Sequence, residues 1–251
     1  MSVLKEILKN KKEELTRRKN ALKLKEIKAR LKDAPATKNF KTAIQRNHNK
    51  KIRLIAEIKK ASPSGGLIRK DFNISEIVSA YNRKDVHAIS VLTEERFFQG
   101  GLEHLIKVRQ ITEKPLLRKD FIFDDYQIYE SRLHGADAIL LIAAALDKSQ
   151  LTDLHGLARE LSLACLSEVH NLEELDKVLY CGADIIGINN RDLNTLKINL
   201  NTTLELLKHI PDSKITVSES GINTREDAET IETTKIDAML VGTTFMKAKD
   251  I

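Results

Sequence analysis

Several segments with the alternating pattern of β-strands end in a charged residue. Residues 53–58 alternate between two faces, one of them wholly apolar, and Glu57 and Lys59 stand together at the carboxyl end of the other face. Further charges at predicted strand ends are Lys119, Glu168 and Glu219. A lysine among carboxylates in a partly desolvated site can act as a general acid, and such a carboxylate can act in proton transfer. Residues 53–58 alone fit an edge strand with a solvated polar face equally well.

Eight strand-like segments alternate with amphipathic, helix-like segments, which indicates parallel pairing. The strands are predicted at 53–58, 87–92, 115–119, 137–142, 163–168, 184–188, 215–218 and 237–241, and helices between them at 74–83, 102–110, 125–133, 148–161, 172–180 and 203–209. A related apolar pattern recurs around residues 88, 138, 185 and 238 and marks alternate strands. The sequence therefore predicts an α/β fold, a (β/α)8 TIM barrel. A doubly wound sheet is the rival, but no glycine-rich fingerprint follows the first strand.

The first fifty residues have a different character. Residues 2–32 carry one stripe of leucine and isoleucine among lysine and glutamate, with no glycine or proline to interrupt a helix. Pro35 ends this pattern, and residues 40–47 predict a short second helix. We therefore expect a helical N-terminal extension at 1–49 and a barrel catalytic domain at 50–251. The eighth barrel helix, after Gly242, is expected to be short or absent.

The net charge of +6 is local, because residues 1–33 hold twelve basic and five acidic side chains. A charge-rich helix usually presents a solvated face, and this one lacks the aromatic side chains of a single-strand binder, so no nucleic-acid partner is predicted. We see no signal peptide and no apolar run long enough to span a bilayer. Two cysteines, Cys165 and Cys181, match no metal spacing. We expect a cytoplasmic protein with reduced thiols and no membrane contact.

Loops after the predicted strands carry groups suited to an anionic ligand. In a barrel the carboxyl ends of the strands converge on one mouth, where such enzymes place their chemistry. Gly221, Gly242 and Thr243 follow the last two strands, the usual place of a phosphate site. Asn189 and Arg191 follow the sixth strand and suit a polar or carboxylate group.

Aromatic residues and histidines near the mouth leave more than one interpretation. Phe97, Phe98 and Phe121 follow the second and third strands, and they either line a pocket for an aromatic substrate or pack as ordinary core residues. His170 lies near the mouth, but no histidine pair has the spacing of a helical metal site. No metal is predicted.

Seven motifs occur in order between about residue 50 and residue 247. They are Ile-Ala-Glu-Ile-Lys-Lys-Ala-Ser-Pro-Ser, Ser-Val-Leu-Thr-Glu-Glu-Arg-Phe-Phe, Leu-Arg-Lys-Asp-Phe-Ile, Gly-Ala-Asp-Ala-Ile-Leu-Leu-Ile, Ser-Glu-Val-His, Gly-Ile-Asn-Asn-Arg-Asp-Leu and Ser-Glu-Ser-Gly-Ile. Because these motifs occur together, the chain resembles the indole-3-glycerol phosphate synthase family of tryptophan biosynthesis. The resemblance extends to the helical N-terminal extension, which in that family packs beside the mouth and helps to close over substrate.

The resemblance implies a cofactor-free ring closure. The substrate, 1-(2-carboxyphenylamino)-1-deoxyribulose 5-phosphate, would lose carbon dioxide and water to give indole-3-glycerol phosphate. Lys119 would be the general acid and Glu168 the general base of the dehydration. Lys59 would hold the substrate carboxylate and assist proton transfer, and Glu57 would orient the lysines and stabilise developing positive charge.

The other residues that the resemblance implies would bind substrate. Substrate-binding positions would be Ser62, Phe98, Phe121, Asn189, Arg191, Leu193, Glu219 and Ser220, and phosphate-binding positions Gly221, Gly242 and Thr243. Thr243 and Asn190 stand where the family commonly has serine, and both keep a polar group.

Two alternatives from other classes remain. A phosphoribosylanthranilate isomerase would need a cysteine and an aspartate at strand ends, and neither Cys165 nor Cys181 is well placed. A non-catalytic protein that binds through its basic N-terminus would show salt-dependent affinity for nucleic acid. We expect a small anionic phosphate substrate as the partner, and a monomer with a weak homo-oligomer as the alternative.

Overall fold

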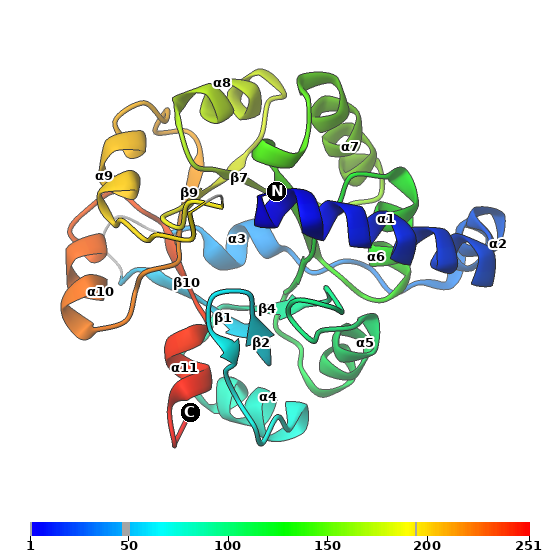
Figure 1. Cartoon of the computed structure of the whole chain (residues 1–251), viewed down its shortest axis with the longest axis horizontal. Coiled ribbons are helices and arrows are strands. Elements are labelled where there is room, and N and C mark those ends of the chain that lie inside the picture. Colours follow the sequence, from blue (N-terminus) through cyan, green and yellow to red (C-terminus); the bar gives the residue numbers. More distant parts are fainter. Residues whose placement is uncertain (1, 47–50, 194) are drawn as a thin grey trace.

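Eight parallel strands close into a barrel in the computed structural model of the chain, which describes residues 2–46, 51–193 and 195–251 (Figure 1). The strands are β1 (Arg53–Ile58), β4 (Ala88–Leu92), β5 (Leu116–Lys119), β6 (Ala138–Ile142), β7 (Ala164–Val169), β8 (Ile185–Asn189), β9 (Ile215–Glu219) and β10 (Ala238–Val241). Each strand pairs with its neighbours in chain order, and β1 closes the barrel by pairing with β10. The predicted TIM barrel is confirmed, with each predicted strand end within one residue of the observed one.

Helices follow the strands around the outside of the barrel. They are α4 (Ile74–Arg83), α5 (Leu102–Ile111), α6 (Asp125–Leu133), α7 (Lys148–Glu160), α8 (Leu172–Tyr180), α9 (Asn201–Leu207), α10 (Arg225–Glu232) and α11 (Thr243–Lys247), with a 3-10 turn, η2 (Ala143–Ala145), before α7. Side chains such as Asn73 and Asn171 accept backbone hydrogen bonds at the helix starts and so fix where these helices begin. The sequence marked no helix at α10, where Ile231 is the one fully buried residue. The last helix, α11, has five residues, as the prediction of a short eighth helix requires.

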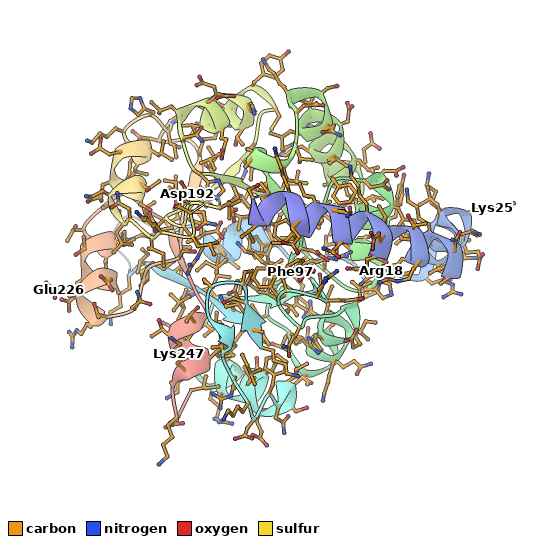
Figure 2. All side chains as sticks on the ribbon, viewed as in Figure 1. Arg18, Lys25, Phe97, Asp192, Glu226 and Lys247 are labelled. Atoms are coloured by element: carbon orange, nitrogen blue, oxygen red, sulfur yellow. The ribbon has the colours of Figure 1, made fainter. Side chains whose placement is uncertain are left out.

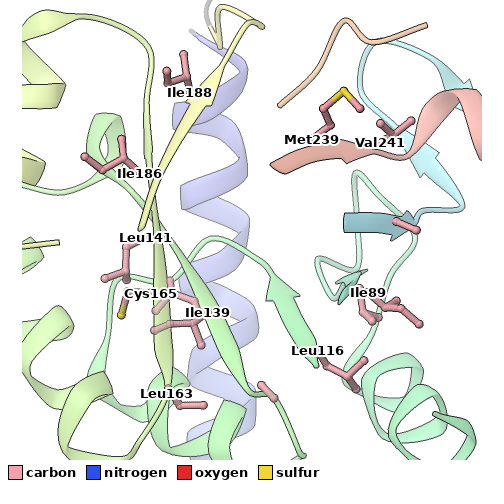
Figure 3. Packing of buried hydrophobic residues seen from close by; sticks show 14 of the residues in the cluster. Ile89, Leu116, Ile139, Leu141, Leu163, Cys165, Ile186, Ile188, Met239 and Val241 are labelled. Atoms are coloured by element: carbon pink, nitrogen blue, oxygen red, sulfur yellow. The ribbon is translucent and has the colours of Figure 1, made fainter. Parts of the chain in front are cut away.

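Alternating side chains along the strands build two cores. Residues such as Ile139, Cys165 and Ile186 lie between the barrel and the helices (Figure 3). Ile55 lies in a second cluster inside the barrel, while Ala56 belongs to the outer layer. The edge-strand interpretation of residues 53–58 is wrong, because β1 is paired on both sides, with β4 and β10.

The N-terminal extension is two helices where the sequence predicted one over residues 2–32. The first, α1 (Val3–Ala21), ends in extended backbone at Leu22, and α2 (Leu24–Arg30) and a 3-10 turn, η1 (Leu31–Asp33), follow. The prediction of one uninterrupted helix is wrong because Tyr126 of the barrel supports the break. Its hydroxyl lies 3.0 Å from the carbonyl oxygen of Arg18, which also accepts the Leu22 N–H, and 2.9 Å from the carbonyl oxygen of Leu22.

The second predicted helix, over residues 40–47, is observed as α3 (Phe40–Ile44). Its predicted end at residue 47, and the predicted boundary between residues 49 and 50, lie outside the described residues. The division into an extension and a barrel domain therefore stays a prediction. None of the described helices is long and apolar enough to cross a membrane.

Ion pairs hold α1 across one end of the barrel (Figure 1). The Lys11 ammonium is buried, with Nζ 2.7 Å from Asp120 Oδ1 and 2.8 Å from Glu14 Oε1. Arg18, labelled on α1 in Figure 2, reaches Glu14 at 2.7 Å and Glu130 at 3.2 Å. Burial alone would raise the pKa of Asp120, but Lys11 and Arg118 hold it far below its usual range. The extension is therefore fixed to the residue that follows Lys119.

Replacing Lys11 tests this attachment. Lys11→Ala is expected to lower the free energy of unfolding by about 3 kcal/mol, because Asp120 and Glu14 stay buried after losing a cationic partner. Urea unfolding followed by circular dichroism measures the change. The control is Lys12→Ala, the same substitution at the exposed next position, which should cost less than about 0.5 kcal/mol. Equal stability of the two variants would show that the buried pair does not hold α1.

Candidate active site

A cavity of about 400 Å³ opens at the mouth of the barrel. Its walls include all fifteen residues that the sequence predicted for the site: Glu57, Lys59, Ser62, Phe98, Lys119, Phe121, Glu168, Asn189, Arg191, Leu193, Glu219, Ser220, Gly221, Gly242 and Thr243. They come together because parallel strands of a barrel all end at the same rim. Their individual roles stay predictions.

Lys119 stands between two carboxylates. Its Nζ lies 3.1 Å from Glu168 Oε2 and also hydrogen-bonds Glu219 Oε2. Burial alone would lower the pKa of the Lys119 ammonium, but the charges of Glu219, Glu168 and Glu57 raise it above its usual range. The lysine is therefore protonated at neutral pH, which is the state that a general acid needs before reaction.

A second pair, Glu57 and Lys59, occupies the end of β1. Lys59 Nζ lies 2.6 Å from Glu57 Oε1, and both side chains are mostly buried. Gly242 makes room for this carboxylate, because a Cβ atom there would collide with Glu57. Glu57 contacts Lys59 directly, whereas the direct carboxylate partners of Lys119 are Glu168 and Glu219.

Glu168 is held as an anion. Burial alone would raise its pKa, but the ammonium of Lys119 lowers it below the usual range. His170 and the side-chain amide of Asn189 act in the same direction. A carboxylate that is ionised, buried and close to a protonated lysine can accept a proton from a substrate carbon.

Glu219 is the carboxylate of this group that ionises least readily. Burial raises its pKa to about 7, with Lys119 opposing the shift and Glu168 adding to it. Its Oε1 atom has no hydrogen-bond partner among the described residues. Gly187 on β8 leaves space for that oxygen, because a Cβ atom there would collide with it. The need for glycine at this strand position is therefore set by a side chain of the next strand, β9.

The raised pKa of Glu219 predicts a pH-dependent stability. The folded protein binds a proton at Glu219 up to about pH 7, whereas the unfolded chain releases it near pH 4.5. The stability that this proton contributes is therefore complete at low pH and is lost as pH rises through about 7. Glu219→Gln should gain thermal stability relative to wild type between pH 5 and pH 8. The control is Glu13→Gln on the exposed face of α1, and a Glu219→Gln difference that does not change with pH would contradict the prediction.

Apolar residues form one wall of the cavity. The rings of Phe98 and Phe121 lie with centroids 6.3 Å apart and planes inclined at 41°. Both line the cavity beside Leu193, whereas Phe97 does not. Val3, Leu4 and Ile7 of α1 belong to the same apolar wall. The family resemblance predicted that the extension packs beside the mouth, but sequence reasoning did not identify which of its residues line the cavity.

The cavity lining also includes Arg191 and residues of a small hairpin. The hairpin strands, β2 (Ala61–Ser62) and β3 (Gly66–Leu67), lie in the loop after β1, where the sequence predicted only a loop. Arg191 Nη1 donates hydrogen bonds to Ser64 Oγ at 3.1 Å and to the Leu196 carbonyl at 3.1 Å. The guanidinium is thereby fixed at the edge of the cavity, where a cation suits an anionic group.

The glycine loops after β9 and β10 lie side by side. Ser220 and Gly221 both have left-handed backbone conformations, with φ of 65° and 84°. Thr244 Oγ1 donates a hydrogen bond to the Ile222 carbonyl at 2.9 Å and ties the two loops together. The two loops are therefore fixed relative to each other at the cavity, and glycine loops of this kind bind anions in phosphate sites.

The buried side chain of Asn190 supports the end of β9 and the loop that follows it. Its Nδ2 atom donates to Ser218 Oγ at 3.1 Å and to the carbonyls of Glu219 and Ser220 at 3.1 and 3.0 Å. Its Oδ1 atom accepts from the Thr203 backbone at 3.1 Å. The sequence marked Asn190 only as a departure from serine, and the structure gives it a buried structural role.

Within residues 2–46, 51–193 and 195–251, no group of three or more His, Cys, Asp and Glu side chains is arranged to hold a metal ion. Cys165 and Cys181 are both free thiols. Metal-free and cofactor-free chemistry stays a prediction that needs a direct test.

The fold and the site together define a (β/α)8-barrel enzyme with its chemistry at the carboxyl ends of the strands. Solved structures share the fold at low identity: N-acetylmannosamine-6-phosphate 2-epimerase from Clostridium perfringens (14% identity, TM-score 0.60, 79% of this chain and 92% of that chain) and thiamine phosphate pyrophosphorylase from Pyrococcus furiosus (17%, TM-score 0.59, 81% and 92%). Residues 4–251 match the indole-3-glycerol phosphate synthase family, and the chain belongs to it. This is a family of decarboxylating lyases of tryptophan biosynthesis.

Curated relatives agree with this assignment. The indole-3-glycerol phosphate synthase of Alkaliphilus metalliredigens is 48% identical over 249 residues, covering 99% of this chain and 95% of that protein. The enzyme of the same name from Dehalococcoides mccartyi is 52% identical over 205 residues, covering 80% of this chain and 79% of that protein. The resemblance inferred from the sequence motifs is therefore confirmed.

Proposed function

We propose that the chain converts 1-(2-carboxyphenylamino)-1-deoxyribulose 5-phosphate into indole-3-glycerol phosphate, carbon dioxide and water, with the catalytic groups identified above. The observation that supports these assignments best is the position of the Lys119 ammonium, mostly buried in the mouth between Glu168 and Glu219. An acid held beside a buried base is the arrangement that two successive proton transfers require.

In the first step Lys119 acts on the ketone. The ring carbon that bears the carboxylate forms a bond to the ketone carbon, and the Lys119 ammonium gives a proton to the ketone oxygen, which becomes a hydroxyl group. Loss of carbon dioxide then restores the aromatic ring. Because Lys119 is protonated and fixed by two carboxylates, no reorganisation is needed to present its proton.

In the last step Glu168 removes a proton from the carbon next to the ring nitrogen, and the Lys59 ammonium gives a proton to the new hydroxyl group, which leaves as water. This dehydration completes the indole ring. The low pKa of Glu168 keeps it ionised for this task. Its contact with Lys119 places the base beside the acid, within the same part of the mouth.

The remaining residues hold the substrate by its charged and aromatic groups. Lys59 holds the ring carboxylate with Arg191 and Asn189 nearby, and Phe98, Phe121 and Leu193 flank the ring. The loops of Gly221, Gly242 and Thr243 bind the phosphate, with Ser62 and Ser220 at the cavity edge. Such anchoring orients the reacting atoms, which lowers the entropic part of the barrier.

Several further properties belong to the same proposal. A biosynthetic enzyme with a phosphorylated metabolite as its substrate suits the cytoplasm, and we expect it to act as a monomer without nucleic-acid or membrane partners. We also expect residues 50–251 to form the catalytic domain and residues 1–49 to serve as an extension that covers its mouth.

The test is turnover of the purified chain with the carboxyphenylamino substrate in the presence of a chelator. Indole fluorescence and released carbon dioxide should appear in equal amounts. The dephosphorylated substrate should be turned over at a much higher KM, because the glycine loops then have no anion to bind. A folded protein that does not bind the substrate would refute the proposal, and activity that needs a metal would refute its cofactor-free chemistry.

A further inference from the structure

His170 lies two residues beyond Glu168 and faces it from the outer side of the site. His170 Nε2 is 3.4 Å from Glu168 Oε1, the carboxylate oxygen that does not contact Lys119. Nε2 is buried and has no aligned hydrogen bond to any described residue. The two oxygens of Glu168 therefore face two different nitrogen groups.

Glu174, in the first turn of α8, fixes the other side of the imidazole. His170 Nδ1 is 2.9 Å from Glu174 Oε2, and the same oxygen accepts the backbone N–H of His170 at 2.8 Å. Glu174 Oε1 accepts a hydrogen bond from Asn171 Nδ2 at 2.8 Å. Because both oxygens of Glu174 are engaged, the ring of His170 is held in one orientation.

The charges around His170 favour its protonated form. Burial alone would lower the pKa of His170, but its hydrogen bond to Glu174 and the charges of Glu168 and Glu174 raise it, with a smaller contribution from Glu219. On its outer side the ring borders a shallow groove that also contains Leu172, Glu173, Thr202, Glu205 and Leu206. With both nitrogens protonated, the imidazolium forms an ion pair with Glu168 across the 3.4 Å between Nε2 and Oε1.

We propose that His170, clamped by Glu174, is a positioning residue for Glu168, holding one oxygen of this base while Lys119 holds the other. The inference rests on the proposed role of Glu168 as the general base. Its consequence is specific: the imidazolium keeps Glu168 ionised and aimed at the substrate when Lys119 has given up its proton and no longer carries a charge.

The experiment compares two variants with different geometry. In His170→Asn the side-chain amide reaches only the position of Nδ1, so the link to Glu174 can persist while Glu168 loses its partner. In His170→Gln the amide reaches the position of Nε2 and keeps a neutral N–H facing Glu168. We expect kcat to fall about tenfold in His170→Asn with KM unchanged, and His170→Gln to recover most of the loss.

The pH profile separates positioning from a merely structural role. Without the cation beside it, Glu168 should be protonated more readily. The acid limb of the pH profile of kcat should therefore move to higher pH in both His170 variants. His155→Asn, the same substitution on α7 far from the mouth, is the matched control and should leave the profile unchanged.

The outcomes distinguish this inference from the proposed function. Unchanged kcat and acid limb in folded His170→Asn would overturn it, as would equal losses in both variants without a shift of the limb. If His170→Asn does not fold, Glu174→Gln gives the same test, because it keeps the imidazole but removes the carboxylate that favours its protonated form. Failure of wild type to turn over the substrate, or full activity of Glu168→Gln, would instead refute the proposed function.

Discussion

Lys119→Ala is expected to lower kcat by about a thousandfold while the folded protein still binds substrate. A positioned general acid contributes roughly 10²- to 10⁴-fold, and Lys119 is the protonated group at the centre of the carboxylate cluster. Initial rates of indole fluorescence at saturating substrate measure the loss. The change in KM should be small, because Lys59 and the glycine loops are assigned the anionic groups of the substrate.

Two controls make this expectation specific. Lys119→Arg keeps a cation beside Glu168 and Glu219 but releases its proton far less readily, so it should also be nearly inactive. Lys107→Ala removes an exposed lysine of α5 and should keep full activity. If Lys119→Ala retained more than a tenth of wild-type kcat, another group would have to supply the proton.

The positions of these charged groups were predictable because they follow from the period of a strand and from the topology of a barrel. Once residues 53–58 were identified as a strand with Glu57 on its inner face, the parallel order of the other strands implied that Lys119, Glu168 and Glu219 share its mouth. The structure places all of them in one cavity. The alternation within each strand and the topology of the barrel both predict that these groups lie at the barrel mouth.

The contacts between these groups were less predictable. Lys119 and Glu219 are one hundred residues apart in the chain and meet through the curvature of the barrel, which a list of strand ends does not contain. Sequence reasoning gave Gly187 no role and assigned Gly242 only to a phosphate site, yet each is also needed because a carboxylate of a neighbouring strand occupies its side-chain space.

The N-terminal extension shows a second limit of sequence reasoning. Its apolar stripe indicated a helix, and the family resemblance placed that helix beside the mouth, but neither showed where the helix bends or which residues it touches. The bend after α1 depends on Tyr126, and its attachment on the pairing of Lys11 with Asp120, both more than a hundred residues away. Such long-range partners override the local preference for one continuous helix.

Glu168→Gln is expected to separate loss of carbon dioxide from formation of the indole. The amide is close in shape to the carboxylate but cannot accept the proton that dehydration releases, so the last step should slow by about a hundredfold or more. Ring closure and decarboxylation precede that step and depend on Lys119, which keeps Glu219 as its partner. Rapid mixing of excess enzyme with substrate should therefore release carbon dioxide promptly, followed by a much slower rise of indole fluorescence.

The same experiment decides which step Glu168 serves. If carbon dioxide and indole are delayed equally in Glu168→Gln, the carboxylate acts at or before ring closure, and its part is to prepare Lys119 rather than to accept the final proton. Lys119→Ala supplies the reference for that outcome, since it should delay both products together. A lag in wild type, where the two groups contact at 3.1 Å, should be absent or short, because the base that ends the reaction is already beside the acid that begins it.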